Sequence, residues 1–505
     1  IMSGFTFEDF RLGLDHRKSE QVSDARSLQE CKNAYVTSGY AISKRPGMDN
    51  LHSSTALDTN FHGLFMFDQK LVTVTHAAGF TSPPTLAGFG IGNPISSTLQ
   101  VVICQNPDNA SDTVKHVWEF LVFNRKPYIV VEFTSGTIRH FYGTLAEHIV
   151  GTGTVITDAN CPNSKSAVVN ASKVFAIGTN AAGDAYIKYS ATEDPTDWSS
   201  PDDASGALGL PAGLESPDED EIVALGVFKN QLVAFMTNNI QLWKTDPDPS
   251  LIELDSVVEN GYVTYTDTIA PLGSDLVFCN VAGFQSAGQM LYTDRMISAD
   301  IGAPVSNIVK PKLATDAATN EPIAIHFSGN DQYICAIKDE MFVLTHSTNA
   351  QLTAWSRYTM AQGSVISGIC SYRDLLYVKM SNASGSFIFG FDPGKYNDDV
   401  AGSVTSDIDV QITSGFQTLG GSGRWKKIYG MDAMFVGTAN IQHRWDARTP
   451  DAKTTAVSLN GDTRPTPMVP VELMTTEISF DITQTANSNL LVNGLTYYYQ
   501  PLGEF

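Results

Sequence analysis

The chain has 505 residues, of which 42% are hydrophobic and 17% are charged, and its net charge is −22. This composition is typical of a folded globular protein and excludes a chain that is disordered throughout. No run of about 18 apolar residues predicts a membrane helix. The first ten residues lack the basic and apolar regions of a signal peptide, so we expect a soluble protein made in the cytoplasm of the producing cell.

Residues 1–50 have the composition of an extended, loop-rich arm. Between positions 11 and 47 the sequence has seven Lys or Arg against four Asp or Glu, which is a local net charge of +3 in an acidic chain. A basic segment of this kind is suited to contact an acidic neighbour. We therefore expect residues 1–50 to be a docking arm, with these candidate contact residues: Arg17, Lys18, Arg26, Lys32, Lys44 and Arg45.

The middle of the chain, residues 51–402, repeats a short strand pattern. The clearest unit has apolar runs at 222–228, 232–236 and 240–243, separated by Lys229-Asn230-Gln231 and Thr237-Asn238-Asn239. Short polar breaks rich in Asn are hairpin signals. Comparable units return about every 40 to 55 residues, the period expected for the blades of a β-propeller. Between them the sequence shows no helix longer than about ten residues.

Two stretches interrupt the strand pattern, and the end of the chain differs from the middle. Residues near 76–113 and 143–172 are rich in Gly, Pro, Ser, Thr or Asn and are expected to be insertions. From 403 to 505 the expected strands become longer, for example over 427–436, 471–482 and 491–500. The sequence therefore predicts an all-β fold: a β-propeller with insertions and a C-terminal β region that either closes the propeller or forms a platform.

Several residues are expected to serve the fold rather than chemistry. Asp-Pro-Thr-Asp-Trp at 194–198 is a natural tight turn, in which Asp side chains bond to local amides and the Trp packs across blades. This interpretation is favoured over a pair of glycosidase carboxylates among Glu193, Asp194 and Asp197. The expected turn and packing residues are Asp197, Trp198, Trp243, Gly283 and Trp355.

No signature of catalysis, cofactor binding or metal binding is found. The Gly88-x-Gly90-x-Gly92 stretch is followed by Asn-Pro, and Gly151-x-Gly153 has Ile156 where a dinucleotide loop has its last Gly. The histidines form no His-Glu-x-x-His motif, and the six cysteines are widely spaced inside apolar runs, which favours buried free thiols. We therefore expect a protein that is not an enzyme and that has no cofactor and no metal.

A series of short stretches resembles one family across most of the chain. The series runs in the family's order through Asn33-Ala34-Tyr35-Val36, Lys44-Arg45-Pro46-Gly47, residues 190–198, Asp220-Glu221-Ile222, residues 232–235, Leu276-Val277-Phe278, Gly283-Phe284, residues 354–358 and residues 492–503. In these stretches the chain resembles the tail nozzle proteins of short-tailed bacteriophages, also called tail tubular or head-completion proteins.

This resemblance implies a structural virion protein of the phage tail. It implies a propeller built into a ring of six copies, docked on the adaptor below the portal, with tail fibres or a needle attached. Such a ring retains packaged double-stranded DNA and conducts it at ejection without binding it tightly. A homo-oligomer, the adaptor and portal complex, and fibre or needle proteins are therefore the expected partners, with no membrane span.

The acidic segment 191–260 agrees with a DNA conduit, because it has fifteen acidic residues against two basic ones, a net charge of −13. A wall of the same sign as DNA lets the duplex slide, whereas a basic wall binds it with counterion release. The candidate lumen or gate residues are Glu215, Asp218, Glu219, Asp220 and Glu221. A solvated loop face is the simpler interpretation of this segment.

The alternatives left open for the whole chain are a glycan- or receptor-binding propeller of a tail fibre complex and a propeller glycoside hydrolase.

Overall fold

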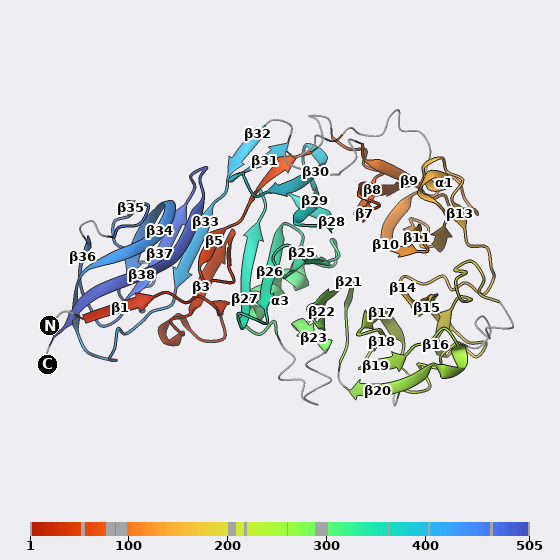
Figure 1. The fold of residues 1–505 in the computed structure, drawn as a ribbon, viewed down its shortest axis with the longest axis horizontal. Coiled ribbons are helices and arrows are strands. Elements are labelled where there is room, and N and C mark those ends of the chain that lie inside the picture. The colour runs from red at the N-terminus through yellow and green to blue at the C-terminus, as the bar shows by residue number, and fades with distance from the viewer. Residues whose placement is uncertain are drawn as a thin grey trace.

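The chain folds into two β-structured parts that lie side by side, a ring of small sheets and an elongated β-domain (Figure 1). The computed structural model describes residues 3–51, 56–76, 86, 98–199, 209–216, 220–259, 261–287, 301–361, 363–401, 404–464 and 468–502. No helix within these ranges combines the length and the apolar character that a membrane crossing requires.

Seven sheets follow one another around the ring and form the blades of a β-propeller. Blade 1 contains β7 (His62–Phe67), β8 (Lys70–Thr75) and β9 (Gln100–Ile103). Blade 2 contains β10 (Val114–Phe123), β11 (Lys126–Phe133), β12 (Ile138–Tyr142) and β13 (Thr154–Val155). Blade 3 contains β14 (Ala167–Asn170), β15 (Lys173–Thr179) and β16 (Ala185–Tyr189). Blades 4 and 5 are β17 (Ile222–Phe228), β18 (Gln231–Met236), β19 (Asn239–Lys244) and β20 (Glu253–Glu259); and β21 (Tyr265–Leu272), β22 (Asp275–Asn280) and β23 (Gly283–Ser286). Blade 6 contains β24 (Ile323–Phe327), β25 (Gln332–Ile337), β26 (Glu340–Ser347) and β27 (Leu352–Thr359). Blade 7 contains β28 (Val365–Tyr372), β29 (Leu375–Asn382), β30 (Gly385–Asp392) and β6 (Gly47–Asn50). Two further strands, β31 (Asn397–Ala401) and β32 (Val404–Asp407), are attached to blade 7.

Two-residue turns explain why these short runs become hairpins. Four of the turns have positive φ at both central residues: Asp68 and Gln69 at 44° and 62°, Asn124 and Arg125 at 45° and 60°, Ala171 and Ser172 at 46° and 59°, and Lys229 and Asn230 at 48° and 64°. This is the type I′ geometry, whose twist matches that of paired antiparallel strands. The predicted all-β propeller is thereby confirmed.

The first and last blades close the ring. The innermost strand of each blade contacts that of the next, and β28 of blade 7 contacts β7 of blade 1. Gly368 of β28 makes this approach possible, since a Cβ atom there would lie 2.8 Å from the backbone nitrogen of Leu64. The outer strand of blade 7 comes from the other end of the chain, because β6 pairs antiparallel with β30, with Asn50 opposite Phe389.

The β-domain combines both ends of the chain in one curved sheet with the order β3-β33-β37-β34-β38-β5-β4. Its strands are β1 (Ser3–Phe7), β3 (Ser27–Lys32), β4 (Ala34–Val36), β5 (Ile42–Lys44), β33 (Val410–Ser414), β34 (Lys426–Arg444), β35 (Val457–Asn460), β36 (Val469–Thr475), β37 (Ser479–Gln484) and β38 (Leu490–Pro501). The sheet continues into the propeller, because β27 pairs in parallel with β2 (Gly13–Leu14) and β3. One hydrophobic core therefore extends from blades 5 and 6 into the β-domain, with Phe284 and Trp355 on one side and Phe480 and Tyr497 on the other.

Several expectations differ from this structure. Residues 1–50 form no loop-rich arm, because their strands are paired inside the β-domain and in blade 7. The expected insertion 143–172 contains α1 (Leu145–Ile149) and also β14, the inner strand of blade 3, and the expected strand 471–482 is divided between β36 and β37. An eleven-residue helix, α3 (Ser306–Asp316), was not expected; Pro311 lies inside it, and its sequence has almost no amphipathic period. Two single 3₁₀ turns, at Glu20–Val22 and Pro249–Leu251, complete the described elements.

Candidate functional site

The residues expected to serve packing and turns are where the fold needs them. Trp198 is fully buried and donates from Nε1 to the Pro195 carbonyl, while its backbone N–H donates to Asp158. Asp197 accepts a hydrogen bond from the backbone N–H of Ser199 and so caps the turn.

The other three packing residues join neighbouring elements. Trp355 stacks on Phe284, with ring centroids 4.7 Å apart, and donates to the Ile301 carbonyl. Trp243 is buried in blade 4 and donates to Gln241. Gly283 has a φ of 115°, which a side chain would strain, at the turn between β22 and β23. These observations agree with a structural role for all five residues.

The candidate acidic gate residues are not equivalent. Glu215 and Glu221 are exposed, whereas Asp220 is buried and accepts hydrogen bonds from Asn238 N–H, Asn238 Nδ2 and Asn239 Nδ2 at 3.1, 2.7 and 2.9 Å. Asp220 therefore fastens the β18–β19 turn and is wrongly assigned to a lumen. Asp218 and Glu219 lie outside the described residues.

Exposed carboxylates are nevertheless numerous in blades 3 and 4 and in the segments that flank their strands. We call this set the acidic rim and define it by Glu193, Asp194, Glu215, Glu221, Asp248, Glu253, Asp255 and Glu259. Strand β20 supplies three of them, because its residues alternate between exposed and half-buried along its length. Lys244 lies 3.0 Å from both Glu253 and Asp255 and neutralises part of this strand. In Figure 1 β20 lies along the lower edge of the propeller.

Three of the six expected docking residues are engaged within the chain. Arg45 is 1% exposed and forms a two-pronged ion pair with Asp398, at 2.9 and 2.5 Å. Lys44 is also buried and donates to the Ala486 carbonyl, and Lys32 pairs with Asp409 at 2.7 Å. Lys44 and Arg45 are buried parts of the fold, so the docking interpretation is wrong for these two, whereas docking through the half-buried Lys32 stays a prediction.

The remaining basic residues lie at the surface of the same segment. Arg17 and Arg26 are exposed and are held by Asp15 and Asp24 two residues earlier, and Lys18 is exposed. Docking through these three residues stays a prediction.

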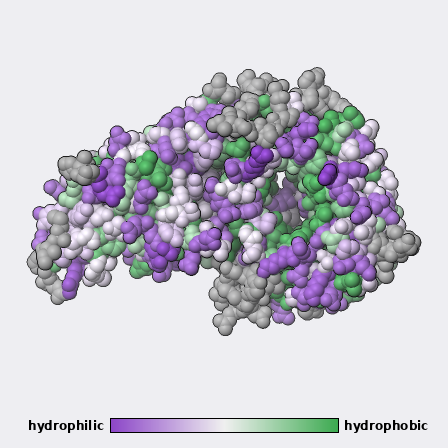
Figure 2. Space-filling view, viewed as in Figure 1, coloured by the Kyte–Doolittle hydropathy of each residue, from purple (hydrophilic) through white to green (hydrophobic). Residues whose placement is uncertain are grey.

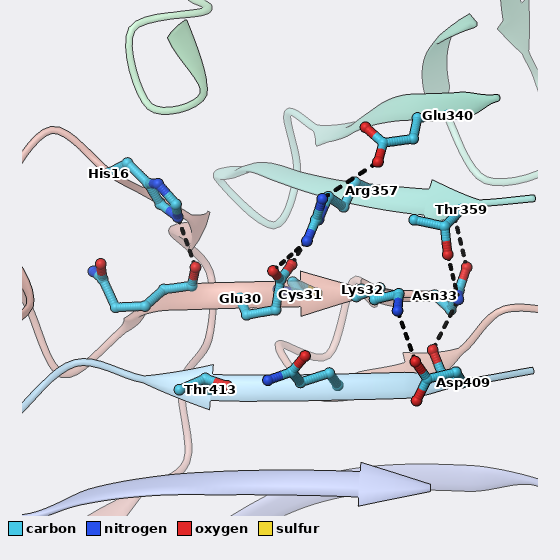
Figure 3. A network of polar contacts seen from close by, with 12 residues as sticks. His16, Glu30, Cys31, Lys32, Asn33, Glu340, Arg357, Thr359, Asp409 and Thr413 are labelled. Atoms are coloured by element: carbon cyan, nitrogen blue, oxygen red, sulfur yellow. Dashed lines mark hydrogen bonds and ion pairs between the residues drawn. The ribbon is translucent and has the colours of Figure 1, made fainter. Parts of the chain in front are cut away.

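The seam between propeller and β-domain is built from charged pairs (Figure 3). Arg357 of β27 donates two hydrogen bonds to Glu30 of β3, at 2.9 and 2.5 Å, and one to Glu340 at 3.4 Å. Next to it, Asn33 bonds to Thr359 of β27 and to the backbone of Asp409. Because these bonds are charge-assisted or buried, the two parts are joined rigidly along this seam.

The centre of the propeller contains a cavity of about 790 Å³. Inner strands of all seven blades line it, and Figure 2 shows the hollow with hydrophobic surface on its wall. Apolar lining residues include Leu225, Ile269, Ile323 and Ile366. This volume is in the range of small-ligand sites and is far too small for duplex DNA.

Charged side chains gather at one side of this cavity, where β10, β21 and β24 begin. His116 Nε2 lies 2.8 Å from Asp267 Oδ2, although the two residues are 151 positions apart in sequence. Glu132 accepts from Lys115 Nζ at 2.6 Å and from Trp118 Nε1 at 2.8 Å. Propeller geometry explains the gathering, because all inner strands run in the same direction and their first residues meet at one mouth.

Three of these groups have shifted pKa values. Burial alone would lower the pKa of His116, but its contact with the Asp267 carboxylate outweighs burial and raises it. Burial, with a contribution from the Asp267 charge, raises the pKa of Glu321 to about 6. The same two causes raise the pKa of Glu119 well above its ordinary value.

Sequence reasoning missed this cluster. None of His116, Glu119, Asp267 and Glu321 is among the site residues expected from the sequence. The one local signal was a charged residue inside an otherwise apolar inner strand, which a solvated strand face explains equally well. The spatial meeting of blades 2, 5 and 6 has no signature in the sequence.

The six cysteines are free thiols, five of them buried, as expected. Burial raises the pKa of each thiol, to about 12 for Cys161, so none has the character of an activated nucleophile. Across the described ranges no three His, Cys, Asp or Glu side chains are grouped closely enough to hold a metal ion.

Comparison with known proteins adds little to this description. No family model matches the chain, and no curated protein matches its sequence. Among solved structures it is similar to the WD40 domain of Pan2 from Neurospora crassa, with 10% identity and a TM-score of 0.35 over 72% of this chain and 98% of that one.

Proposed function

We propose that this protein is a structural subunit of the tail nozzle of a short-tailed bacteriophage, where copies assemble into a ring that retains and conducts DNA. The resemblance of the segments between residues 33 and 503 supports this proposal. The observation that carries it is the acidic rim, because blades 3 and 4 and the segments that flank their strands bear eight exposed carboxylates.

The DNA path in this proposal lies between subunits. The central cavity of about 790 Å³ is too small for a duplex, so a channel requires several chains around a common axis. A rim with excess negative charge facing that axis repels the phosphates and keeps the DNA mobile. The rigid seam between propeller and β-domain suits a part that must keep its shape under the load of packaged DNA.

The first test is whether the chain forms rings. Negative-stain imaging and mass photometry of the purified protein, alone and with portal and adaptor proteins, should show rings with an axial hole. A monomer that ignores both partners would contradict the proposal.

A second measurement tests the placement of the acidic rim. Glu221 and Glu259 are exposed and lie at the same end of blade 4. The double variant Glu221→Lys with Glu259→Lys should leave ring formation intact. It should slow DNA ejection several-fold at low salt, because the new positive charges attract the phosphates. The matched control is Glu8→Lys with Asp451→Lys, which changes the same charge on exposed residues of the β-domain. Equal ejection rates for the two variants would argue against a rim that faces the channel.

A second candidate function is a ligand-binding propeller of a tail fibre complex. The cavity favours it, because its volume and its mixed apolar and charged lining are typical of sites for small molecules. Binding of glycans on an array by a monomeric chain would support this alternative over the nozzle.

A further inference from the structure

The central cavity contains a carboxylate that has no partner in the described part of the chain. Glu321, directly before β24, lines the cavity and forms no hydrogen bond or ion pair there. Its acidic neighbours are different, since Asp267 contacts His116 and Glu132 contacts Lys115. Glu321 is therefore the open position in an otherwise paired cluster.

A second polar group at the same place is also open. The Thr266 hydroxyl oxygen is buried at the cavity wall and has no hydrogen-bond partner within the described ranges. Thr266 directly precedes Asp267 on β21, and both residues line the cavity together with Glu321. Leaving a buried hydroxyl and a half-buried carboxylate unpaired costs free energy, which a ligand with several N–H donors would recover.

We propose that this cavity binds a cationic nitrogen group, an alkylguanidinium or alkylammonium, which Glu321, Asp267 and Thr266 contact while the apolar wall receives the alkyl stem. Guanidinium has five N–H donors in a plane and suits a set of separated acceptors. The stem would lie along Leu225, Ile269 and Ile323. This site is independent of the proposed channel between subunits.

The carboxylates nearest to Glu321 favour a cation over an anion, and Lys379, which also lines the cavity, donates to the Phe61 carbonyl. Lys115 and Lys165, which could attract an anion, lie 2.6 and 3.9 Å from Glu132, whose carboxylate balances one of their two charges. An anion would instead meet the carboxylates of Glu321 and Asp267. A cation near these two carboxylates would favour the ionised form of Glu321 and so oppose the Asp267 charge, which contributes to its raised pKa.

Binding should therefore strengthen as pH rises. The charged groups that influence Glu321 are Asp267 on β21, His116 on β10, Glu132 on β11 and Lys165 before β14. Ionisation of Glu321, whose pKa is about 6, adds a negative charge to the cavity wall. This change favours a cation at pH 7.5 over pH 5.

The test is calorimetric titration of the full chain with 1-butylguanidinium, with neutral 1-butylurea as the isosteric control ligand. We expect binding at about pH 7.5 that weakens about tenfold or more at about pH 5, and no comparable binding of butylurea. Glu321→Gln should weaken binding about tenfold at the higher pH, whereas Glu8→Gln, on the exposed start of the β-domain, should not.

Thr266→Val provides a second variant that keeps every charge and should weaken binding by a smaller factor. The capped tripeptide Ala-Arg-Ala distinguishes the source of the ligand: tighter binding than butylguanidinium supports a protein side chain, and weaker binding supports a free small molecule. Equal affinity for butylguanidinium and butylurea, or an unchanged affinity in Glu321→Gln, would overturn the proposal. Ring formation is measured separately, so failure here and failure of the nozzle proposal are distinguishable.

Discussion

The buried ion pair between Arg45 and Asp398 should determine how firmly the propeller is closed. Arg45 lies two residues before the start of β6, with Pro46 between them. Asp398 lies on β31, which pairs in parallel with β6. Asp398 also accepts a hydrogen bond at 3.1 Å from the backbone N–H of Met48, inside β6. One carboxylate thus holds the closing strand through both a side chain and the backbone.

Asp398→Asn keeps the volume of the side chain and removes its charge. The guanidinium of Arg45, 1% exposed, would then be left without a counter-charge, although its bond to Asn33 at 3.0 Å remains. Removing one partner of a buried ion pair costs about 3 to 5 kcal/mol. Since the amide can still accept some of the hydrogen bonds, we expect a loss of about 3 kcal/mol.

Urea unfolding followed by tryptophan fluorescence measures the loss, and hydrogen exchange of residues 47–50 shows whether β6 opens first. Arg45→Met combined with Asp398→Asn should be less destabilising than the sum of the two single changes, because no unpaired charge is left behind. Asp446→Asn is the matched control, because its partner Arg448 is 86% exposed and a surface pair contributes little. If Asp398→Asn and Asp446→Asn unfold at the same urea concentration with equal exchange at β6, the reasoning is refuted.

Two further changes test single buried polar groups. Asp220→Ala would remove the carboxylate that accepts from the side chains of Asn238 and Asn239, so we expect a loss of about 1 to 3 kcal/mol in the free energy of unfolding, measured in urea. The exposed neighbour provides the control, because Glu221→Ala should have little effect. Equal unfolding midpoints for the two variants would contradict the role of Asp220 in holding the β18–β19 turn. Lys379 donates to the Phe61 carbonyl at the closure of the ring, and burial lowers its pKa to about 8, whereas in the unfolded chain it titrates near about 10.4. Between these two pKa values the unfolded state binds more protons than the native state, so the free energy of unfolding should rise with pH. From pH 7 to pH 10.5 we expect it to rise by about 3 kcal/mol more in the unmodified chain than in Lys379→Met, measured by unfolding both proteins at each pH. A constant difference over that range would show that Lys379 has an ordinary pKa.

Much of the propeller could be predicted from local sequence. The Lys229-Asn230 turn needs two residues that tolerate positive φ, and the alternating or continuous apolar runs beside it need a buried sheet. The Asp-Pro-Thr-Asp-Trp turn likewise contains its own hydrogen-bond acceptors. Helix α3 could not be predicted in this way, because its sequence lacks the local signals on which a helix prediction depends.

The candidate cavity site could not be predicted in this way. His116 and Asp267 are single polar residues in strand-like runs, and nothing near either one in sequence indicates the other. Their contact exists because the inner strands of blades 2 and 5 start at the same mouth of the ring. Shifted pKa values such as that of Glu321 depend on burial and neighbours, which are tertiary properties.

The sequence alone therefore determined the class of fold, the hairpins, the free thiols and the uneven distribution of charge, because turn chemistry, strand period and composition act over a few residues. Only the tertiary structure decided that the two ends of the chain share one sheet, that β6 closes the ring, and that Lys44 and Arg45 are buried rather than free for docking. The physical reason is that strand pairing between distant segments depends on how much apolar surface the whole chain can bury. No local pattern encodes that sum.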